Sequence, residues 1–300
     1  MLSTALAAAS SAPPLSGVRA PALLRHHLPI EILRRRNETT SESYNWSGYA
    51  LTGATGSVTD VKSSWVIPSV AGTCGRIPQG YAAFWTGIDG WESATVEQIG
   101  TDSDCVNLEG TRTGTPTYYA WYEFYPADAY LIGRYSASGA CESDCLSPGD
   151  RISAEVRLTP NGPGRIGPGG VVPHPVGPLF TVTITDETQR WSFTTSAMVP
   201  GAKLSSAEWV VEAPYGCKSS GRFCALADFG TADYGNYLTS VAQTAYATVG
   251  GVTQPIGSFG SRIQEAVMVS YPAGTATMAE PAPLEGSGTS FTDVWSNQGP

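Results

Sequence analysis

The chain has 300 residues, enough for one large domain with a sizeable core. Apolar residues make up 41% and charged residues only 14%, and the 34 glycines and 22 prolines predict many turns rather than long helices. The net charge of −9 argues against nucleic-acid binding. The sequence contains no run of about 18 apolar residues that would predict a membrane-spanning helix. We therefore expect neither nucleic acid nor a membrane as a partner.

The N-terminal region differs in charge from the rest of the chain. Residues 1–36 hold five arginines against the single acid Glu31, whereas the remainder holds 12 basic and 25 acidic residues. This contrast predicts that residues 1–43 are a leader and a basic prosegment, which docks on the acidic body as its inhibitor and is later removed. An unprocessed disordered tail is the alternative. Residues 44–300 would then form a single domain.

Alternating apolar and polar residues predict strands after Tyr44. Residues 152–159 and 180–185 show this period of two most clearly, which is typical of half-buried antiparallel strands. Further strand-like runs cover residues 63–67, 82–86, 118–125, 209–212, 243–249 and 262–271. We expect an all-β fold, a sandwich of two antiparallel sheets with a concanavalin-like or jelly-roll-like arrangement. The Gly- and Pro-rich residues 160–178 would form a long hairpin loop.

The six cysteines predict disulfides rather than a zinc site, because their number is even and no Cys-x-x-Cys occurs. Disulfides indicate an oxidising compartment, and hence secretion. Cys217 and Cys224 bracket a predicted hairpin tip and are expected to pair. The pairing of the other four stays open, with Cys74–Cys105 and Cys141–Cys145 as the preferred arrangement.

Counting histidines narrows the possible chemistries. His26 and His27 lie in the predicted prosegment, and His174 lies in the Gly- and Pro-rich loop. Serine and cysteine nucleophiles need a rigidly held base, and hydrolytic zinc sites use histidine ligands, so the sequence argues against both. We expect no cofactor and no metal, which leaves carboxylates, amides and tyrosines. With no oligomer seam in the pattern, we expect a monomer.

Clusters of aromatic residues with acids or amides lie at residues 45–49, 84–102, 120–126 and 207–214. A strand tryptophan more often belongs to the core than to a cleft. A carboxylate among such aromatics either joins a polar network or does chemistry.

These clusters resemble the motifs of the glutamic peptidases, the eqolisin family of acid-acting secreted proteases. Six elements occur in the family's order: Asn45-Trp46-Ser47-Gly48, Trp85-Thr86-Gly87-Ile88-Asp89-Gly90, Gln98-Ile99-Gly100-Thr101-Asp102, Trp121-Tyr122-Glu123, Glu208-Trp209-Val210-Val211-Glu212 and Ala227-Asp228-Phe229-Gly230. They span nearly the whole chain after Tyr44. The family's fold is a sandwich of two antiparallel sheets, in agreement with the alternation. The chain departs from the family in lacking cysteines within residues 91–95 and 200–206.

The resemblance implies a secreted endopeptidase that hydrolyses polypeptides in acid with Gln98 and Glu212 as its catalytic pair. Glu208 would share a strand face with Glu212 and is the main competitor for its role. The resemblance also implies cleft-lining or supporting roles for a set of other residues: Trp46, Trp85, Asp89, Asp102, Glu123 and Glu208 itself.

The chemistry of such a pair is coherent. A glutamate can take a proton from water and return it to the leaving amine. A glutamine amide can donate to the developing oxyanion without titrating. The alternatives are a carbohydrate-binding, lectin-like sandwich and a glycoside hydrolase that pairs Glu212 with Glu208 or Asp89. A sugar-binding module would not require an amide and a carboxylate that converge on one water.

Overall fold

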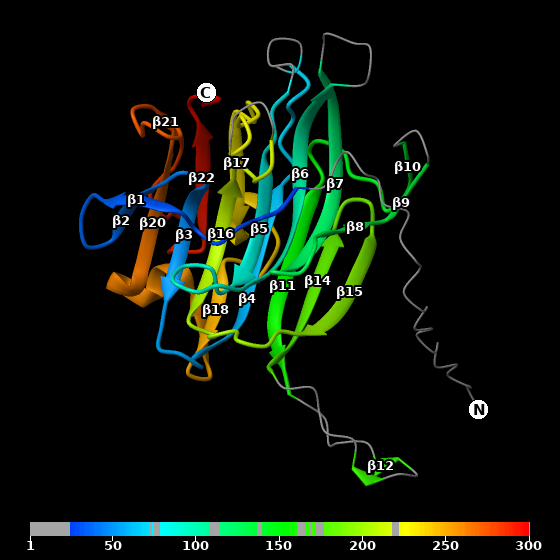
Figure 1. Cartoon of the computed structure of the whole chain (residues 1–300), viewed down its shortest axis with the longest axis vertical. Coiled ribbons are helices and arrows are strands. Elements are labelled where there is room, and N and C mark those ends of the chain that lie inside the picture. Colours follow the sequence, from blue (N-terminus) through cyan, green and yellow to red (C-terminus); the bar gives the residue numbers. More distant parts are fainter. Residues whose placement is uncertain are drawn as a thin grey trace.

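Strands make up most of the structure (Figure 1). The computed structural model describes residues 25–299 except residues 73, 75–78, 108–113, 137–139, 161–165, 168–169, 172–176 and 218–221. Helices in these ranges are limited to the short α1 (Asn236–Thr239) and the 3-10 segment η1 (Ile256–Arg262). None of the helices in the described ranges has the length and apolar character needed to cross a membrane.

The first layer of the fold carries the strands of the aromatic motifs. Its order is β8–β7–β6–β5–β16–β3–β20, and each strand is antiparallel to its neighbour. The bounds are β3 (Trp46–Thr52), β5 (Ala83–Ile88), β6 (Val96–Asn107), β7 (Gly114–Tyr125), β8 (Tyr130–Ile132), β16 (Ser206–Glu212) and β20 (Ile263–Val269).

The second layer runs β15–β14–β11–β4, and β4 continues to β18 and, at one residue pair, to β17. Strands β21 and β22 connect the layers along one edge, because β20 pairs with β21, β21 with β22 and β22 with β17. The bounds are β4 (Val58–Val66), β11 (Arg151–Thr159), β14 (Leu179–Asp186), β15 (Trp191–Met198), β17 (Thr231–Gly235), β18 (Tyr246–Val249), β19 (Val252–Pro255), β21 (Thr277–Pro281) and β22 (Ser290–Trp295).

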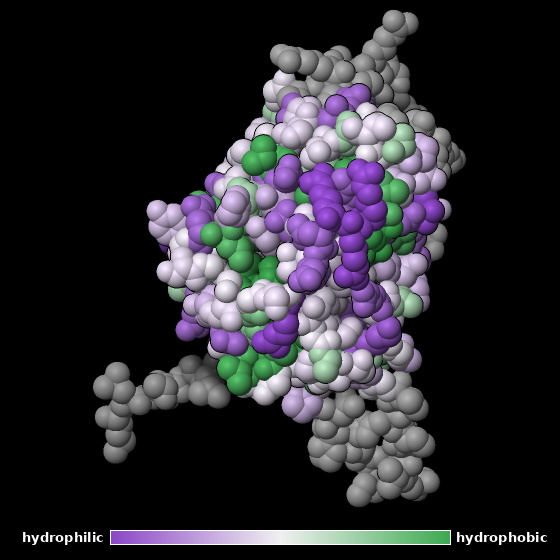
Figure 2. Space-filling view, turned by 90° about the vertical axis from the view of Figure 1, so that its left-hand side faces the viewer, coloured by the Kyte–Doolittle hydropathy of each residue, from purple (hydrophilic) through white to green (hydrophobic). Residues whose placement is uncertain are grey.

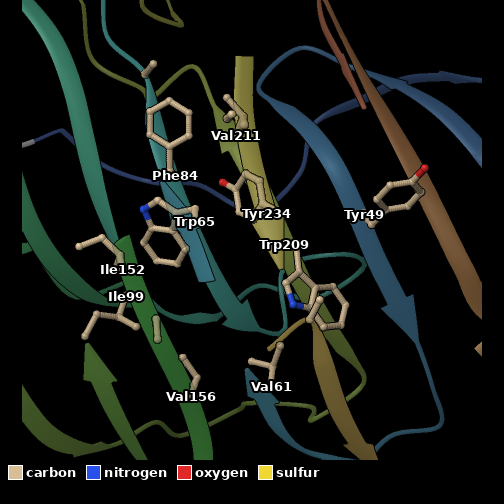
Figure 3. Close-up of a cluster of buried hydrophobic side chains, with 14 of the residues drawn as sticks. Tyr49, Val61, Trp65, Phe84, Ile99, Ile152, Val156, Trp209, Val211 and Tyr234 are labelled. Carbon is tan, nitrogen blue, oxygen red and sulfur yellow. The ribbon is translucent and has the colours of Figure 1, made fainter. Parts of the chain in front are cut away.

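The main core fills the space between the two layers (Figure 3). Alternate residues of the strands contribute the side chains of this core. In β11, Ile152, Ala154 and Val156 point inward, whereas Arg151 and Arg157 are exposed. Polar atoms of core aromatics also join the layers. Trp65 Nε1 in β4 donates to Thr101 Oγ1 in β6 at 2.9 Å, Trp209 Nε1 in β16 donates to the Lys62 carbonyl at 3.0 Å, and the Tyr234 hydroxyl in β17 donates to the Val210 carbonyl at 2.7 Å. These hydrogen bonds give a partner to buried donors that would otherwise have none.

The N-terminal residues of the described chain pack on the first layer. Strands β1 (Ile32–Arg35) and β2 (Thr40–Ser43) form a hairpin, and β2 pairs in parallel with β20. Arg34 and Arg36 both bind the Glu42 carboxylate. Figure 2 shows the side of the molecule on which this hairpin lies in Figure 1, and strongly hydrophilic residues gather there.

The structure confirms the all-β class and the two layers of strands that the sequence predicted. It also forms all three preferred disulfides, Cys74–Cys105, Cys141–Cys145 and Cys217–Cys224. The Gly- and Pro-rich region connects β11 to β14, which pair antiparallel as the hairpin prediction requires. Most of its residues lie outside the described ranges, and the described parts include β12 (Ile166–Gly167) and β13 (Gly170–Val171). The small strands β9 (Arg134–Tyr135) and β10 (Cys141–Ser143) pair separately.

Candidate active site

The motif residues meet on the outer face of the first layer, the face that points away from the main core. Residues opposite each other in an antiparallel ladder point to the same side. Gln98 in β6 lies opposite Gly87 and Glu123, and Glu212 in β16 lies opposite Trp46 and Ala83. A second apolar cluster supports this face, formed by Trp46, Ala50, Ala83, Trp85, Trp91, Val96, Tyr119, Trp121, Val210 and Ala266.

Residues 25–31 of the chain itself occupy this face, and we call them the N-terminal segment. In Figure 1 the chain before β1 crosses β5, β16 and β3. Its main chain is clamped along its length: Trp46 Nε1 donates to the Leu28 carbonyl at 3.0 Å, and the Ile30 amide donates to the Gly90 carbonyl at 3.1 Å. Asn45 holds the segment with its side chain, donating to the Pro29 carbonyl at 3.1 Å and accepting from the Glu31 amide at 2.8 Å.

The peptide unit between His27 and Leu28 lies between Gln98 and Glu212. Gln98 Nε2 donates to the His27 carbonyl oxygen at 2.8 Å, and the Leu28 amide donates to Glu212 Oε1 at 3.2 Å. Gln98 Nε2 also lies 3.2 Å from Glu123 Oε2. Because both partners of this amide atom are oxygens, the atom has to be the NH₂ donor. The arrangement directs an amide donor at a peptide carbonyl and a carboxyl at the adjoining nitrogen.

The second oxygen of Glu212 is also engaged. Trp85 Nε1 donates to Glu212 Oε2 at 2.9 Å, and His27 Nδ1 lies 3.2 Å from the same oxygen. The carboxyl is fully buried, and this burial raises its pKa well above the usual value, with the Glu123 charge adding to the effect. Burial conversely lowers the pKa of the His27 imidazole well below its usual value, so the ring is neutral near pH 7.

Glu123 connects the Gln98 amide to the N-terminal segment. Its Oε2 atom accepts from Gln98 and from the His27 amide at 3.0 Å, and its Oε1 atom lies 3.0 Å from His26 Nδ1. Burial raises the pKa of Glu123, and the hydrogen bond from His26 opposes this rise. The same hydrogen bond raises the pKa of His26.

Asp102 acts on Trp121 rather than on Gln98. Asp102 Oδ1 accepts from Trp121 Nε1 at 2.6 Å, and the Tyr119 hydroxyl lies 2.8 Å from both Asp102 Oδ2 and Asp104 Oδ2. A phenol has one proton, so it can donate to only one carboxylate, and the other carboxyl has to be protonated. Burial raises the pKa of Asp102 to about 7 and that of Asp104 well above its usual value, which favours protonation of this pair of carboxyls. This network fixes Trp121, whose ring stacks on His27 at 3.6 Å.

The other predicted residues separate into two groups. Trp46 and Trp85 contact the N-terminal segment and Glu212, as described above. Asp89 instead holds a loop, because it accepts from the backbone amides of Lys203, Leu204 and Ser205 at 2.6–2.9 Å. Glu208 is fully buried, which raises its pKa well above the usual value, and the charges of Asp89 and Glu97 add to the effect.

The sequence did not single out several residues of this site. Asn45 and Trp121 lie inside the sequence motifs, but the sequence assigned them no role. Tyr119 is two residues from Trp121 and Asp104 is two residues from Asp102, so each pair points to the same face of its strand. That alternation was the available signal. His26 and His27 fall in the predicted prosegment, and nothing local in the sequence indicates that they contact residues nearly 100 and 185 positions later. In the described ranges, no group of three or more His, Cys, Asp or Glu residues is arranged to hold a metal ion.

Comparisons with known proteins agree with this geometry. Residues 44–166 match the model of the Peptidase A4 family. Aspergillopepsin-2 of Aspergillus niger is 31% identical over 243 residues, which cover 74% of this chain and 71% of the relative. The solved structure of scytalido-glutamic peptidase with a peptide-based transition state analog covers 84% of this chain and 98% of its own, with 19% identity and a TM-score of 0.58.

A second solved structure, SCP-B of the eqolisin family in a complex with the tripeptide Ala-Ile-His, covers the same shares at 19% identity and a TM-score of 0.56. At this identity the structural likenesses establish the shared fold, and the relative from Aspergillus niger establishes the family. A peptidase assignment sets aside the sugar-binding and glycosidase alternatives. The chain therefore belongs to the Peptidase A4 family and is a glutamic endopeptidase.

Proposed function

We propose that this peptidase hydrolyses polypeptides with Gln98 and Glu212 as a catalytic dyad. The observation that carries the proposal is the His27–Leu28 peptide unit, whose carbonyl accepts from Gln98 and whose nitrogen donates to Glu212. With a substrate in this place, Gln98 stabilises the oxyanion. Glu212 takes a proton from the attacking water and returns it to the leaving nitrogen. The titration of one carboxyl then sets the activity, because the amide does not ionise.

We propose that the enzyme is secreted, acts in acidic surroundings as a monomer and is inhibited by its own N-terminal segment. Three disulfides support an oxidising compartment. The segment covers both members of the dyad, so no other polypeptide can bind there while it is in place. Its burial of Glu212 also raises the pKa of the base, and its removal exposes the carboxyl to water. The pKa then falls towards its usual value, and the base ionises in mildly acidic solution.

The test compares Glu212→Gln with Glu208→Gln. Both glutamates lie on β16 and are fully buried, so the two variants make the same chemical change four residues apart. Each protein is first treated in acid with bead-bound wild-type enzyme, so that both lose the N-terminal segment in the same way. Hydrolysis of an unfolded protein is then measured from pH 2 to pH 7, with the fold checked by circular dichroism.

We expect acid-restricted hydrolysis by the wild type, its loss in Glu212→Gln and its retention in Glu208→Gln. Because burial already favours the uncharged form of Glu208, the neutral glutamine is a close replacement. Activity that persists in Glu212→Gln and disappears in Glu208→Gln would move the base to Glu208. Activity in both variants would refute the dyad.

A further inference from the structure

The N-terminal segment lies in the site in the manner of a substrate, and one of its bonds is in the reacting position. Gln98 reaches the carbonyl oxygen of His27 and no other carbonyl of the segment among the described hydrogen bonds. Glu212 reaches the nitrogen of the next residue, Leu28. These are the two atoms that need stabilisation during hydrolysis, since the carbonyl oxygen gains charge and the nitrogen gains a proton.

Contacts on both sides hold this bond in register. The Arg25 guanidinium donates to the Tyr81 hydroxyl at 3.0 Å, and the His26 carbonyl accepts from the Tyr215 amide at 3.0 Å. After the bond, Trp46 and Asn45 bind the carbonyls of Leu28 and Pro29. The segment therefore cannot slide by one residue without losing a series of hydrogen bonds, and the geometry selects one bond.

One contact works against hydrolysis. A water that attacks the His27 carbonyl has to be activated by Glu212, but both oxygens of that carboxyl are already engaged. Oε1 faces the Leu28 amide, and Oε2 faces Trp85 and the His27 imidazole. The imidazole is held there by its stacking on Trp121 at 3.6 Å, with the ring planes 1° from parallel. The ring of the residue that would be cut thus occupies the place of the water.

We propose that the enzyme's first substrate is its own His27–Leu28 bond, and that the His27 imidazole delays the cut by capping Glu212. The proposal rests on the Gln98–Glu212 dyad. When the ring leaves Oε2, water reaches the carboxyl, which lowers the pKa of Glu212 and lets it ionise. A water then takes the place of the ring, and its oxygen bonds to the His27 carbonyl carbon. Glu212 accepts a proton from the water, the bond between that carbon and the Leu28 nitrogen breaks, and the proton passes to the nitrogen. The products are a carboxyl on His27 and an amino group on Leu28.

The test follows the full-length protein after transfer to the acidic pH at which it hydrolyses an added unfolded protein. Mass spectrometry identifies the first new N-terminus and C-terminus, and the reaction is run in water enriched in ¹⁸O. We expect an N-terminus at Leu28 and one ¹⁸O atom in the carboxyl of His27. Because the bond lies in the active site of its own chain, the rate constant should not depend on protein concentration.

Three variants probe the mechanism. Glu212→Gln should stay uncut when it is incubated alone. His27→Ala removes the ring that occupies the place of the water, so it should be cut faster, by about tenfold, which corresponds to about 1.4 kcal/mol. His174→Ala makes the same change in the Gly- and Pro-rich loop and should be cut at the wild-type rate.

The outcomes distinguish this inference from the proposed function. A first cut elsewhere, for example after the Arg34-Arg35-Arg36 run, in a protein that hydrolyses the added substrate would overturn the inference and leave the dyad standing. Cutting of His27→Ala at the wild-type rate or more slowly would overturn the capping role. Cutting of Glu212→Gln at the wild-type rate, or failure of the wild type to hydrolyse any substrate, would overturn the dyad and the inference together.

Discussion

Glu123 Oε2 lies 3.2 Å from Gln98 Nε2 and accepts a hydrogen bond from this amide. The two residues are opposite each other in the β6–β7 ladder, so the strands themselves set their separation. Glu123 has no contact with the Leu28 nitrogen or the His27 carbonyl oxygen among the described hydrogen bonds. In the proposed dyad its role would therefore be to position Gln98, and it also binds the main chain of the N-terminal segment through the His27 amide.

Glu123→Ala should lower kcat by about 10-fold to 100-fold, because the Gln98 amide loses the partner that orients it. This is less than the loss of about 10²–10³ expected when an oxyanion donor is removed outright. Glu123→Gln should recover part of the rate, since its amide oxygen can still accept. The measurement is kcat and KM of the processed enzymes on one peptide substrate. A change in KM alone would show that Glu123 binds substrate and does not position Gln98.

Gln98→Ala should lower kcat by about 10²–10³, because the oxyanion loses its amide donor. The pH profile of the residual activity should keep its shape, since Gln98 does not titrate and Glu212 remains the base. The measurement is kcat from pH 2 to pH 7 for the processed variant and the wild type. An acid limb displaced by a full pH unit would contradict this assignment, because Gln98 would then act through the ionisation of Glu212.

Stability should fall as the pH rises, contrary to the behaviour of proteins whose carboxylates are paired with cations. Burial raises the pKa of Asp293 to about 8, with Ser47 Oγ as its hydrogen-bond donor, and that of Asp102 to about 7. At pH values between the unfolded-state pKa near 3.8 and these folded-state pKa values, the folded state binds more protons than the unfolded state. The contribution is complete below pH 3.8 and is lost as the pH passes through about 7 and 8.

Each pKa unit corresponds to about 1.4 kcal/mol, so the free energy of unfolding should be several kcal/mol lower at pH 8 than at pH 4. Asp293→Asn is the matched variant, since its side chain is neutral throughout and still meets Ser47. It should lose less stability between these two pH values than the wild type. Urea unfolding at pH 4, 6 and 8 measures both. A free energy that rises with pH would show that the buried acids are ionised in the folded protein.

The sequence predicted the architecture well because the information is local. In β11 the alternation alone identifies the inward face, and its exposed arginines confirm the period. In β5 and β16 every residue is buried, so an alternation of apolar and polar residues could not have identified their faces. One face meets the core, while the other carries the site and the N-terminal segment. There the resemblance to a family supplied the assignment of Gln98 and Glu212.

The sequence predicted that the N-terminal region docks on the body, but it could not predict the contacts that hold this region in the site. The contact between His27 and Glu212 joins residues 185 positions apart and exists only in the folded chain. The basic charge of the first 36 residues suggested docking on an acidic body. The contacts that carry this docking are mostly main-chain hydrogen bonds and a stacked ring, which charge does not reveal. Of the β1 arginines, Arg34 binds Glu42 in the adjoining strand β2, and Arg35 binds Glu92.

Tyr119→Phe should destabilise the protein, and more strongly at pH 8 than at pH 4. The phenol joins Asp102 to Asp104, and its removal leaves two buried carboxyls without their shared partner, at a cost of about 1–3 kcal/mol. The Tyr119 hydrogen bond also lowers the pKa of Asp102, so its loss raises that pKa further above about 7. A larger difference between the pKa of Asp102 in the folded and unfolded states means that more stability is lost on going to high pH.

Urea unfolding of Tyr119→Phe at pH 4 and pH 8 tests this, with Tyr130→Phe as the control because the Tyr130 side chain is 52% exposed. The control should change stability by less than about 0.5 kcal/mol at both pH values. A second readout is the fluorescence of Trp121, whose Nε1 atom depends on Asp102 for its acceptor. Equal destabilisation at the two pH values would mean that Asp102 does not titrate between them, and that the phenol contributes through packing rather than through the shared proton.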